Sequence, residues 1–157
     1  MNLPAQIAKH FKDVHFGGNW TAVNLKTTLA DVSWQQACAK IDSFNTIAIL
    51  VYHMNYYVNA ITRVIQGGPL DARDKYSFDC PPIQSQQDWE NLLHKIWTDA
   101  EVFARLVEQF PEEKLAENFN DGKYGTIYRN LAGVIEHIHY HLGQIVFIKK
   151  MLQTGKV

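Results

Sequence analysis

The sequence shows no pattern of a disulfide framework, a membrane-spanning segment or a secretion signal. Its two cysteines, Cys38 and Cys80, form neither a Cys-x-x-Cys pair nor a disulfide framework, which fits a reducing compartment. The longest strongly apolar run, residues 47–52, is far shorter than the roughly 20 residues that cross a bilayer. The first residues lack a basic flank followed by an apolar stretch, so we expect a cytoplasmic protein without a membrane partner.

An excess of positive charge is also missing. Fifteen Lys and Arg residues stand against sixteen Asp and Glu residues, which leaves a net charge of -1. We therefore expect no nucleic-acid partner, because no excess of positive charge is present to neutralise a phosphate backbone.

The hydrophobic share of 46% is that of a globular chain. The length of 157 residues, without a repeat or a linker, predicts a single domain over residues 1–157.

Apolar residues recur every three or four positions along most of the chain, which predicts amphipathic helices and no β-strand of useful length. Long helices are expected over residues 3–14, 47–65, 89–110 and 126–152, and a short one over residues 21–29. We expect Ser43 and Ser85 to cap the second and third long helices. Each long helix must bury its apolar face, so we predict an all-α four-helix bundle. The loop at residues 70–82 leaves room for a long crossover connection.

Three of the seven histidines lie close together in the last predicted helix, at His137, His139 and His141. Residues four positions apart lie about 40° apart around a helix, so His137 and His141 share a face, whereas His139 points nearly opposite. That face borders the apolar stripe, and His53 has the same relation to the stripe of the second long helix. The spacing predicts a divalent metal site made by His53, His137 and His141, with a position left for water or substrate.

The same spacing also has a plainer interpretation, in which partly buried histidines donate to backbone carbonyls and bind no metal. The other histidines, His10, His15 and His94, are expected at the surface or at the rim of a stripe. Other metal centres found in helical bundles require different sequence motifs. A di-iron carboxylate site requires two Glu-x-x-His motifs, and only Glu136 with His139 matches one. The Cys-x-x-Cys-His motif of covalent haem is absent.

Two segments carry a family resemblance. Residues 136–145, Glu-His-Ile-His-Tyr-His-Leu-Gly-Gln-Ile, preceded by the lone His53, resemble the DinB-like superfamily, also called the DinB/YfiT-like metalloenzymes. The early Gly17-Gly18-Asn19-Trp20 is similar to the Gly-x-x-Trp turn of that family after its first helix. The resemblance runs from the first helix to the last, and its metal pattern needs three histidines in this order.

The resemblance implies a four-helix bundle with a crossover connection, and a divalent metal held by three histidines of the second and last long helices. By position, His53, His137 and His141 match those ligands, and His139 does not. The family often forms homodimers. Its members with assigned activity include transferases and isomerases that depend on bacillithiol or mycothiol, which implies a low-molecular-weight thiol as a second cofactor.

Three further residues are candidates for a role beside the metal. Gln144, one turn after His141, is expected either to hydrogen-bond a ligand histidine or to lie solvated on the helix surface. Tyr57 is expected either to present its hydroxyl to a substrate or to pack along its stripe. Trp20 is expected either to wall a pocket or to pack in the core.

The predicted chemistry follows from the charge of the site. Three neutral ligands leave the ion its full +2 charge, which favours an anionic fourth ligand such as hydroxide, thiolate or carboxylate. Among the ions that imidazole suits, we expect zinc or nickel. We therefore predict a metal-dependent hydrolase or bacillithiol-type S-transferase that acts on a small molecule. The alternatives are a non-catalytic bundle that binds metal or another ligand, and a structural bundle in which the histidines only pack. The loops at residues 70–82 and 112–125 decide how open the site is.

Overall fold

A computed structural model describes residues 1–155, and it confirms the all-α class: these residues contain six α-helices, two short 3-10 helices and no β-strand. The predicted single domain ends at residue 157, and its last two residues lie outside the described ones. The elements are α1 (Leu3–Phe16), α2 (Leu25–Leu29), α3 (Trp34–Cys38), α4 (Ile47–Ile65), η1 (Asp74–Tyr76), α5 (Gln86–Glu108), η2 (Glu112–Ala116) and α6 (Ile127–Thr154).

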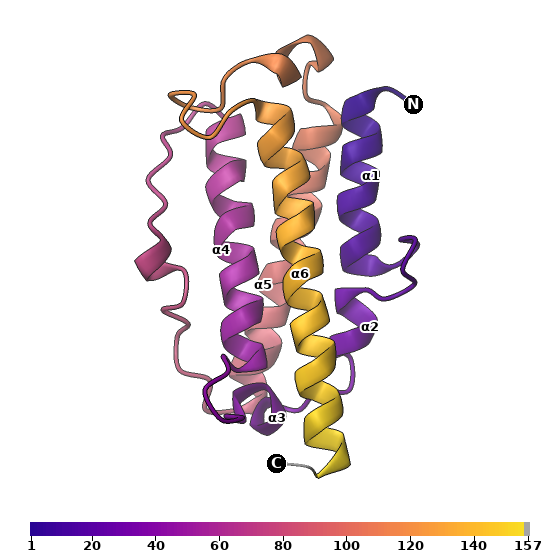
Figure 1. The fold of residues 1–157 in the computed structure, drawn as a ribbon, viewed down its shortest axis with the longest axis vertical. Coiled ribbons are helices and arrows are strands. Elements are labelled where there is room, and N and C mark those ends of the chain that lie inside the picture. The colour runs from indigo at the N-terminus through magenta and orange to yellow at the C-terminus, as the bar shows by residue number, and fades with distance from the viewer. Residues whose placement is uncertain (156–157) are drawn as a thin grey trace.

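The four long helices, α1, α4, α5 and α6, lie side by side, with α2 and α3 at the lower end of the molecule in Figure 1. In that view α1 and α6 run downward and α4 and α5 run upward. The chain therefore has to return from the end of α4 to the start of α5, and residues 66–85 do this along the outside of the molecule. None of the described helices is both long enough and apolar enough to cross a membrane.

Side-chain caps explain where several helices begin. Ser85 accepts a hydrogen bond from the backbone N–H of Asp88, as predicted, and Thr126 does the same for Arg129 at the start of α6. The predicted cap at Ser43 is wrong, because the hydroxyl of Thr46 accepts from Ile49 N–H and α4 starts directly after it. The cap is thus set by the residue next to the apolar stripe, three positions after Ser43.

The short helix predicted over residues 21–29 is only partly correct, because α2 begins at Leu25. Asn24 caps it by accepting from Thr27 N–H, and Ala22, just before, has a positive φ of 56° that no α-helix contains. The sequence analysis missed α3. Its signal was a capping box in which the Ser33 hydroxyl accepts from Gln36 N–H and the Gln36 side chain accepts from Ser33 N–H.

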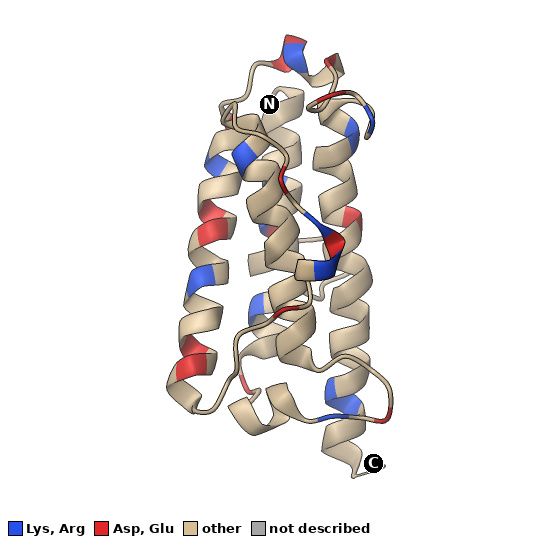
Figure 2. Cartoon of the chain, turned by 90° about the vertical axis from the view of Figure 1, so that its left-hand side faces the viewer, with Lys and Arg blue, Asp and Glu red and all other residues tan. Residues whose placement is uncertain are grey.

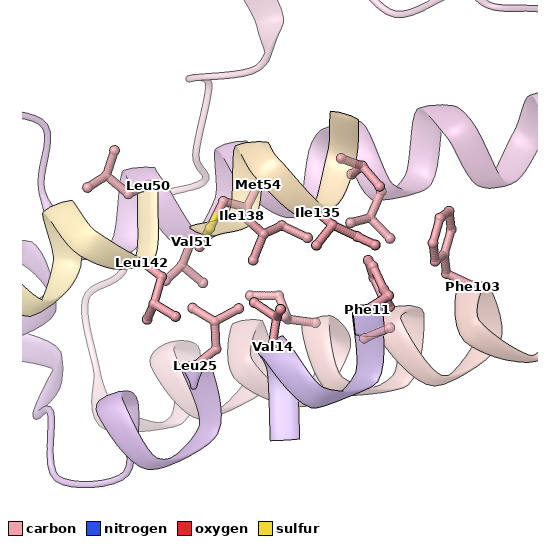
Figure 3. Packing of buried hydrophobic residues seen from close by; sticks show 14 of the residues in the cluster. Phe11, Val14, Leu25, Leu50, Val51, Met54, Phe103, Ile135, Ile138 and Leu142 are labelled. Atoms are coloured by element: carbon pink, nitrogen blue, oxygen red, sulfur yellow. The ribbon is translucent and has the colours of Figure 1, made fainter. Parts of the chain in front are cut away.

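The apolar faces of all four long helices meet in one core (Figure 3). At one end of it, the rings of Phe11 on α1 and Phe103 on α5 pack with their centroids 4.3 Å apart, and both side chains are fully buried. The other residues labelled in the figure are Val14, Leu25, Leu50, Val51, Met54, Ile135, Ile138 and Leu142. The core therefore fixes α4 directly against α6, the two helices that carry the predicted metal ligands.

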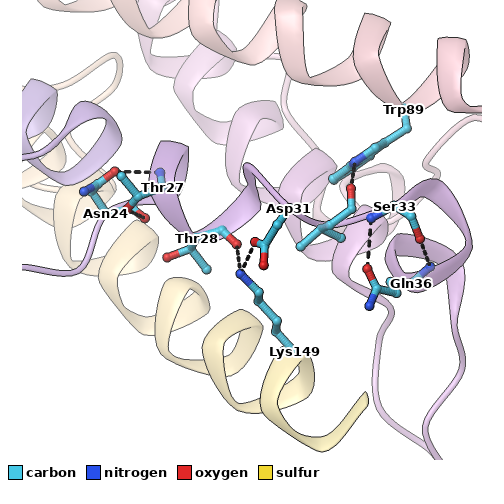
Figure 4. A network of polar contacts seen from close by, with 9 residues as sticks. Asn24, Thr27, Thr28, Asp31, Ser33, Gln36, Trp89 and Lys149 are labelled. Carbon is cyan, nitrogen blue, oxygen red and sulfur yellow. Dashed lines mark hydrogen bonds and ion pairs between the residues drawn. The ribbon is translucent and has the colours of Figure 1, made fainter. Parts of the chain in front are cut away.

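Polar contacts fasten the short helices to this frame (Figure 4). The indole N–H of Trp89 donates to the carbonyl of Val32 at 2.9 Å from within the core. The ammonium of Lys149 on α6 donates to the carbonyl of Thr28 at 2.8 Å and pairs with Asp31. Charges of both signs are interspersed on the face drawn in Figure 2, in keeping with the near-zero net charge.

His15 corrects one prediction, because it was expected at the surface or at the rim of an apolar stripe and is only 2% exposed. Its Nδ1–H donates to the carbonyl of Phe11 at 2.9 Å, one helical turn earlier. Burial lowers the pKa of His15 from 6.5 to about 4, and the hydrogen bond to Phe11 opposes this only in part. The folded protein therefore holds His15 neutral.

The buried neutral imidazole predicts a loss of stability in acid. Below pH 6.5 the unfolded chain protonates His15, whereas the folded chain resists protonation down to about pH 4. Between pH 7 and pH 5 this residue is expected to lower the free energy of unfolding by about 2 kcal/mol. Urea unfolding at both pH values should therefore show a smaller pH dependence in His15→Leu than in the parent protein.

The control for this experiment is His94→Leu, because His94 is exposed. That variant is expected to retain the pH dependence of the parent. An equal pH dependence in His15→Leu and the parent would contradict the assignment of His15 as a neutral buried group.

Candidate metal centre

The three histidines predicted to bind metal come together between α4 and α6. His53 lies on α4, and His137 and His141 lie one turn apart on α6. The Nε2 atom of His137 is 3.0 Å from the Nε2 atoms of both His53 and His141. The ligand atoms of all three lie within 4.8 Å of one another, so the group could hold a metal ion. Its geometry agrees with the spacing argued from the sequence.

A hydrogen bond on the far side of the ring fixes the tautomer of His53. The hydroxyl of Ser77 donates to the carbonyl of Asp74 at 2.7 Å, which leaves its oxygen as an acceptor. His53 Nδ1 lies 2.9 Å from this oxygen and therefore carries the hydrogen. Its Nε2 atom thus presents a lone pair to the other two histidines. Ser77 is fully buried, so this contact is shielded from water.

Gln144 fixes the tautomer of His141 in the same way. Its side-chain carbonyl Oε1 lies 2.7 Å from His141 Nδ1, and its amide Nε2 donates to the hydroxyl of Tyr140 at 3.2 Å. The imidazole therefore donates from Nδ1 and directs the lone pair of Nε2 inward. The structure thus confirms that Gln144 hydrogen-bonds a candidate ligand, which was one of the two expectations for it.

The third histidine, His137, faces the lone pairs of the other two, and a bound cation would accept both of them. His137 Nε2 faces two lone-pair nitrogens, yet a neutral ring has one N–H and satisfies at most one of them. Its Nδ1 atom is buried without a hydrogen-bond partner. Zinc binds imidazole nitrogen at about 2.0–2.1 Å, which separates tetrahedral ligand atoms by about 3.3 Å. The donor atoms and their spacing therefore fit a divalent metal ion.

Burial also keeps these rings in the form that binds metal. Loss of hydration lowers the pKa of His53, His137 and His141, and that of His137 falls to about 4. The neighbouring imidazoles lower the pKa of His53 and His137 further, because a second positive charge at this distance is repelled. All three are therefore neutral at pH 7, and neutral imidazole is the ligand form.

Aromatic rings surround the cluster. Phe78 stacks on His53 with the ring centroids 4.0 Å apart and the planes 14° from parallel. Tyr57 presents its ring edge-on to His53 and to His137, in each case at 5.2 Å between centroids. These contacts hold the imidazole planes in place and exclude water from part of the site.

A cavity of about 660 Å³ opens beside His53 and His137. Its lining includes Tyr57 and Asp74, and the hydroxyl of Tyr57 donates to the carboxylate of Asp74 at 2.7 Å. Burial and this hydrogen bond raise the pKa of Tyr57 to about 12, so its hydroxyl stays protonated. A small molecule held in this cavity would lie beside two of the three histidines, His53 and His137.

The other sequence candidates divide between this cavity and the surface. Tyr57 lines the cavity, and its hydroxyl already has a partner in Asp74. Both expectations for Trp20 are wrong, because its side chain is fully exposed and lines none of the described cavities. The turn before α2 directs the indole into solvent. His139 lies beside His10, away from the cluster, as predicted from its place on the opposite side of the helix from His137.

The segment 66–85 supplies the residues that the sequence analysis missed. Asp74, Ser77 and Phe78 all contact the cluster or line its cavity. They lie in residues 70–82, which were predicted as a loop that decides how open the site is, without a role for any single residue. Ser77 follows His53 by 24 positions, and no local pattern links the two. The loop at residues 112–125, by contrast, contributes none of the residues that line this cavity.

Comparisons with known proteins give no family assignment. No protein-family model matches the chain, and neither a curated protein nor a solved structure matches it. The resemblance to the DinB-like superfamily therefore stays a prediction. Any function has to be argued from the geometry of the histidine cluster, its hydrogen-bond partners and the cavity beside it.

The role of Ser77 can be tested through metal affinity. Ser77→Ala removes the acceptor for His53 Nδ1–H and is expected to weaken zinc binding about 10–100-fold, because the ring loses its orientation and basicity. Competition with a chromogenic chelator measures the affinity. Ser43→Ala is the matched control, since Ser43 is exposed. Equal affinity in Ser77→Ala and the parent would refute the orienting role.

Proposed function

We propose that this protein binds one divalent metal ion through His53, His137 and His141 and acts as a metal-dependent enzyme on a small molecule. The observation that carries the proposal is the convergence of three Nε2 atoms, of which those of His53 and His141 present lone pairs, beside a cavity of about 660 Å³. In purely packed histidines each buried ring nitrogen would be expected to find a hydrogen-bond partner, and the Nδ1 atom of His137 has none.

The residues around the cluster have distinct proposed roles. When bound there, a divalent ion with a free position supplies Lewis-acid chemistry, which lowers the pKa of a water or a thiol and polarises a substrate oxygen. Ser77 and Gln144 hold two of the rings in the ligating tautomer. Asp74 offers a carboxylate oxygen in the cavity to accept a proton, and Tyr57 keeps that carboxylate in place.

The reaction class remains the pair predicted from the sequence. Hydrolysis and S-transfer with a bacillithiol-type thiol both use an anionic fourth ligand at a site without protein carboxylate ligands. Asp74 supports either reaction, since each begins with removal of a proton from water or from a thiol. Zinc and nickel are the proposed ions.

The proposed family is the DinB-like superfamily, with α1, α4, α5 and α6 as a four-helix bundle and residues 66–85 as its crossover connection. The common direction of α4 and α5 supports this assignment. The exposed Trp20 departs from the role in core or pocket that we expected for it. The homodimer, the low-molecular-weight thiol and the cytoplasmic location stay predictions.

Metal content tests the ligand set. Protein purified without chelators and without a tag is expected to contain about one equivalent of zinc or nickel by elemental analysis. His53→Ala and His137→Ala are expected to contain almost none, because two imidazoles remain in each. His139→Ala, on the same helix but outside the cluster, is the matched control and is expected to keep its metal. Full metal in His137→Ala would overturn the assignment.

Turnover tests the enzyme. The metal-loaded protein is assayed against activated esters and, with bacillithiol, against alkylating electrophiles. Activity is expected to disappear on chelation, to return with one ion, and to fall at least tenfold in Asp74→Asn at unchanged metal content. A protein whose melting temperature drops on chelation, but which turns over none of these substrates, would instead be the non-catalytic metal-binding bundle.

A further inference from the structure

A second cavity, of about 570 Å³, lies between α4, α5 and the connecting segment 66–85. It shares no lining residue with the cavity beside the histidine cluster. The two cavities use different faces of α4: Tyr56 and Asn59 line this one, whereas His53 and Tyr57 line the other. The volume is within the range of small-molecule sites, roughly 300–1,000 Å³.

A half-buried carboxylate organises the polar part of this cavity. One oxygen of Asp99 on α5 accepts three hydrogen bonds, from the side-chain amides of Asn55 at 2.7 Å and Asn59 at 2.8 Å and from the ammonium of Lys95 at 2.7 Å. Asn55, Asn59 and Lys95 all line the cavity. Their positions are therefore fixed before any ligand arrives.

This arrangement leaves two hydrogen-bond acceptors without partners. The amides of Asn55 and Asn59 both direct their N–H groups to Asp99, so their carbonyl oxygens point away from it. Neither oxygen has a hydrogen-bond partner in the described residues, and neither is sealed from solvent-accessible space. Since both residues line the cavity, its polar end offers acceptors to N–H groups.

Much of the remaining lining is apolar. Tyr52 and Tyr56 contribute rings from α4, and Pro81, Pro82 and Leu92 face them from the connection and from α5. The hydroxyl of Tyr56 is held by both backbone groups of Arg73, at 2.8 Å from N–H and 3.1 Å from the carbonyl. The ring of Tyr56 is therefore a fixed wall.

The charges around the cavity are already compensated. Arg63 is paired with Asp71 and Lys95 with Asp99. The carboxylate of Asp88 accepts from the Ser85 hydroxyl and from Gln84 N–H at the start of α5. No lining charge needs a counter-charge from the ligand, so a neutral molecule fits best.

From these features we propose that the cavity between α4, α5 and residues 71–83 is a second ligand site, which takes a neutral planar molecule with a primary carboxamide or amino-heterocycle edge. The N–H donors of that edge meet the carbonyl oxygens of Asn55 and Asn59, and the flat body lies between the tyrosines and the prolines. The site is independent of the proposed metal chemistry, because the two cavities are lined by different residues.

The test uses benzamide as the probe and benzoate as the control ligand. Benzoate has the same ring as benzamide but carries a negative charge and has no N–H group. Binding to the isotope-labelled full chain is followed by NMR. Benzamide is expected to bind with a Kd of about 1 mM, typical of so small a ligand. It should shift the side-chain amide signals of Asn55 and Asn59 and the backbone signals of residues 81–83. Benzoate is expected to bind at least tenfold more weakly.

A matched pair of variants locates the binding. Ala60→Leu places extra volume in this cavity and is expected to abolish benzamide binding, whereas Ala132→Leu does the same in the histidine cavity and should leave it unchanged. Should Ala60→Leu fail to fold, Leu92→Trp fills the cavity from α5. The proposal is overturned by absence of benzamide binding at 20 mM (about twentyfold the expected Kd), by equal binding of benzoate, or by binding that survives the filled cavity.

The same titration in His53→Ala separates the two proposals. Benzamide binding is expected to be unchanged in this variant, whether or not the parent protein holds metal. Loss of binding together with loss of metal would place the probe at the histidine cluster instead and would overturn the second site.

Discussion

The packing of α4 against α6 is the constraint on which the candidate metal centre depends. The Nε2 atom of His137 approaches those of His53 and His141 to 3.0 Å, and its neutral ring can offer an N–H to only one of these two lone pairs. Apolar residues of both helices lie in the core, among them Met54 and Ile138, which follow His53 and His137 in the sequence. The free energy gained by burying these residues holds α4 against α6, and this keeps the three rings together.

Local patterns in the sequence were sufficient to predict the four long helices and the cluster of three histidines. The spacing of His137 and His141 is a property of one helix, and the relation of His53 to its own apolar stripe fixes which face it occupies. The start of α5 was equally accessible, because Ser85 and Asp88 form a capping pattern within one turn. These features depend on residues within two turns of one another, which is the range over which helical periodicity carries information.

Contacts made by irregular segments could not be predicted in this way. The hydrogen bond between Ser77 and His53 depends on the path of residues 66–85, which has no periodicity. The burial of His15 and the exposure of Trp20 depend on how α1 and the turn after it meet the rest of the molecule. A polar residue near the edge of an apolar stripe can lie either in the core or at the surface. Only the packing of the helices decides between the two.

Adjacent residues of α4 serve different cavities, and this has a consequence for how the protein can change. Tyr56 lines the cavity against α5, and Tyr57 lines the one beside the histidines. Each residue turns a helix by about 100°. A single-residue deletion between His53 and Tyr56 would therefore rotate the following side chains away from both cavities at once. The rotational position of the residues along α4 is thus constrained as tightly as the identity of any histidine in the cluster. Insertions are far easier to accommodate in residues 66–85, the segment that runs along the outside of the molecule.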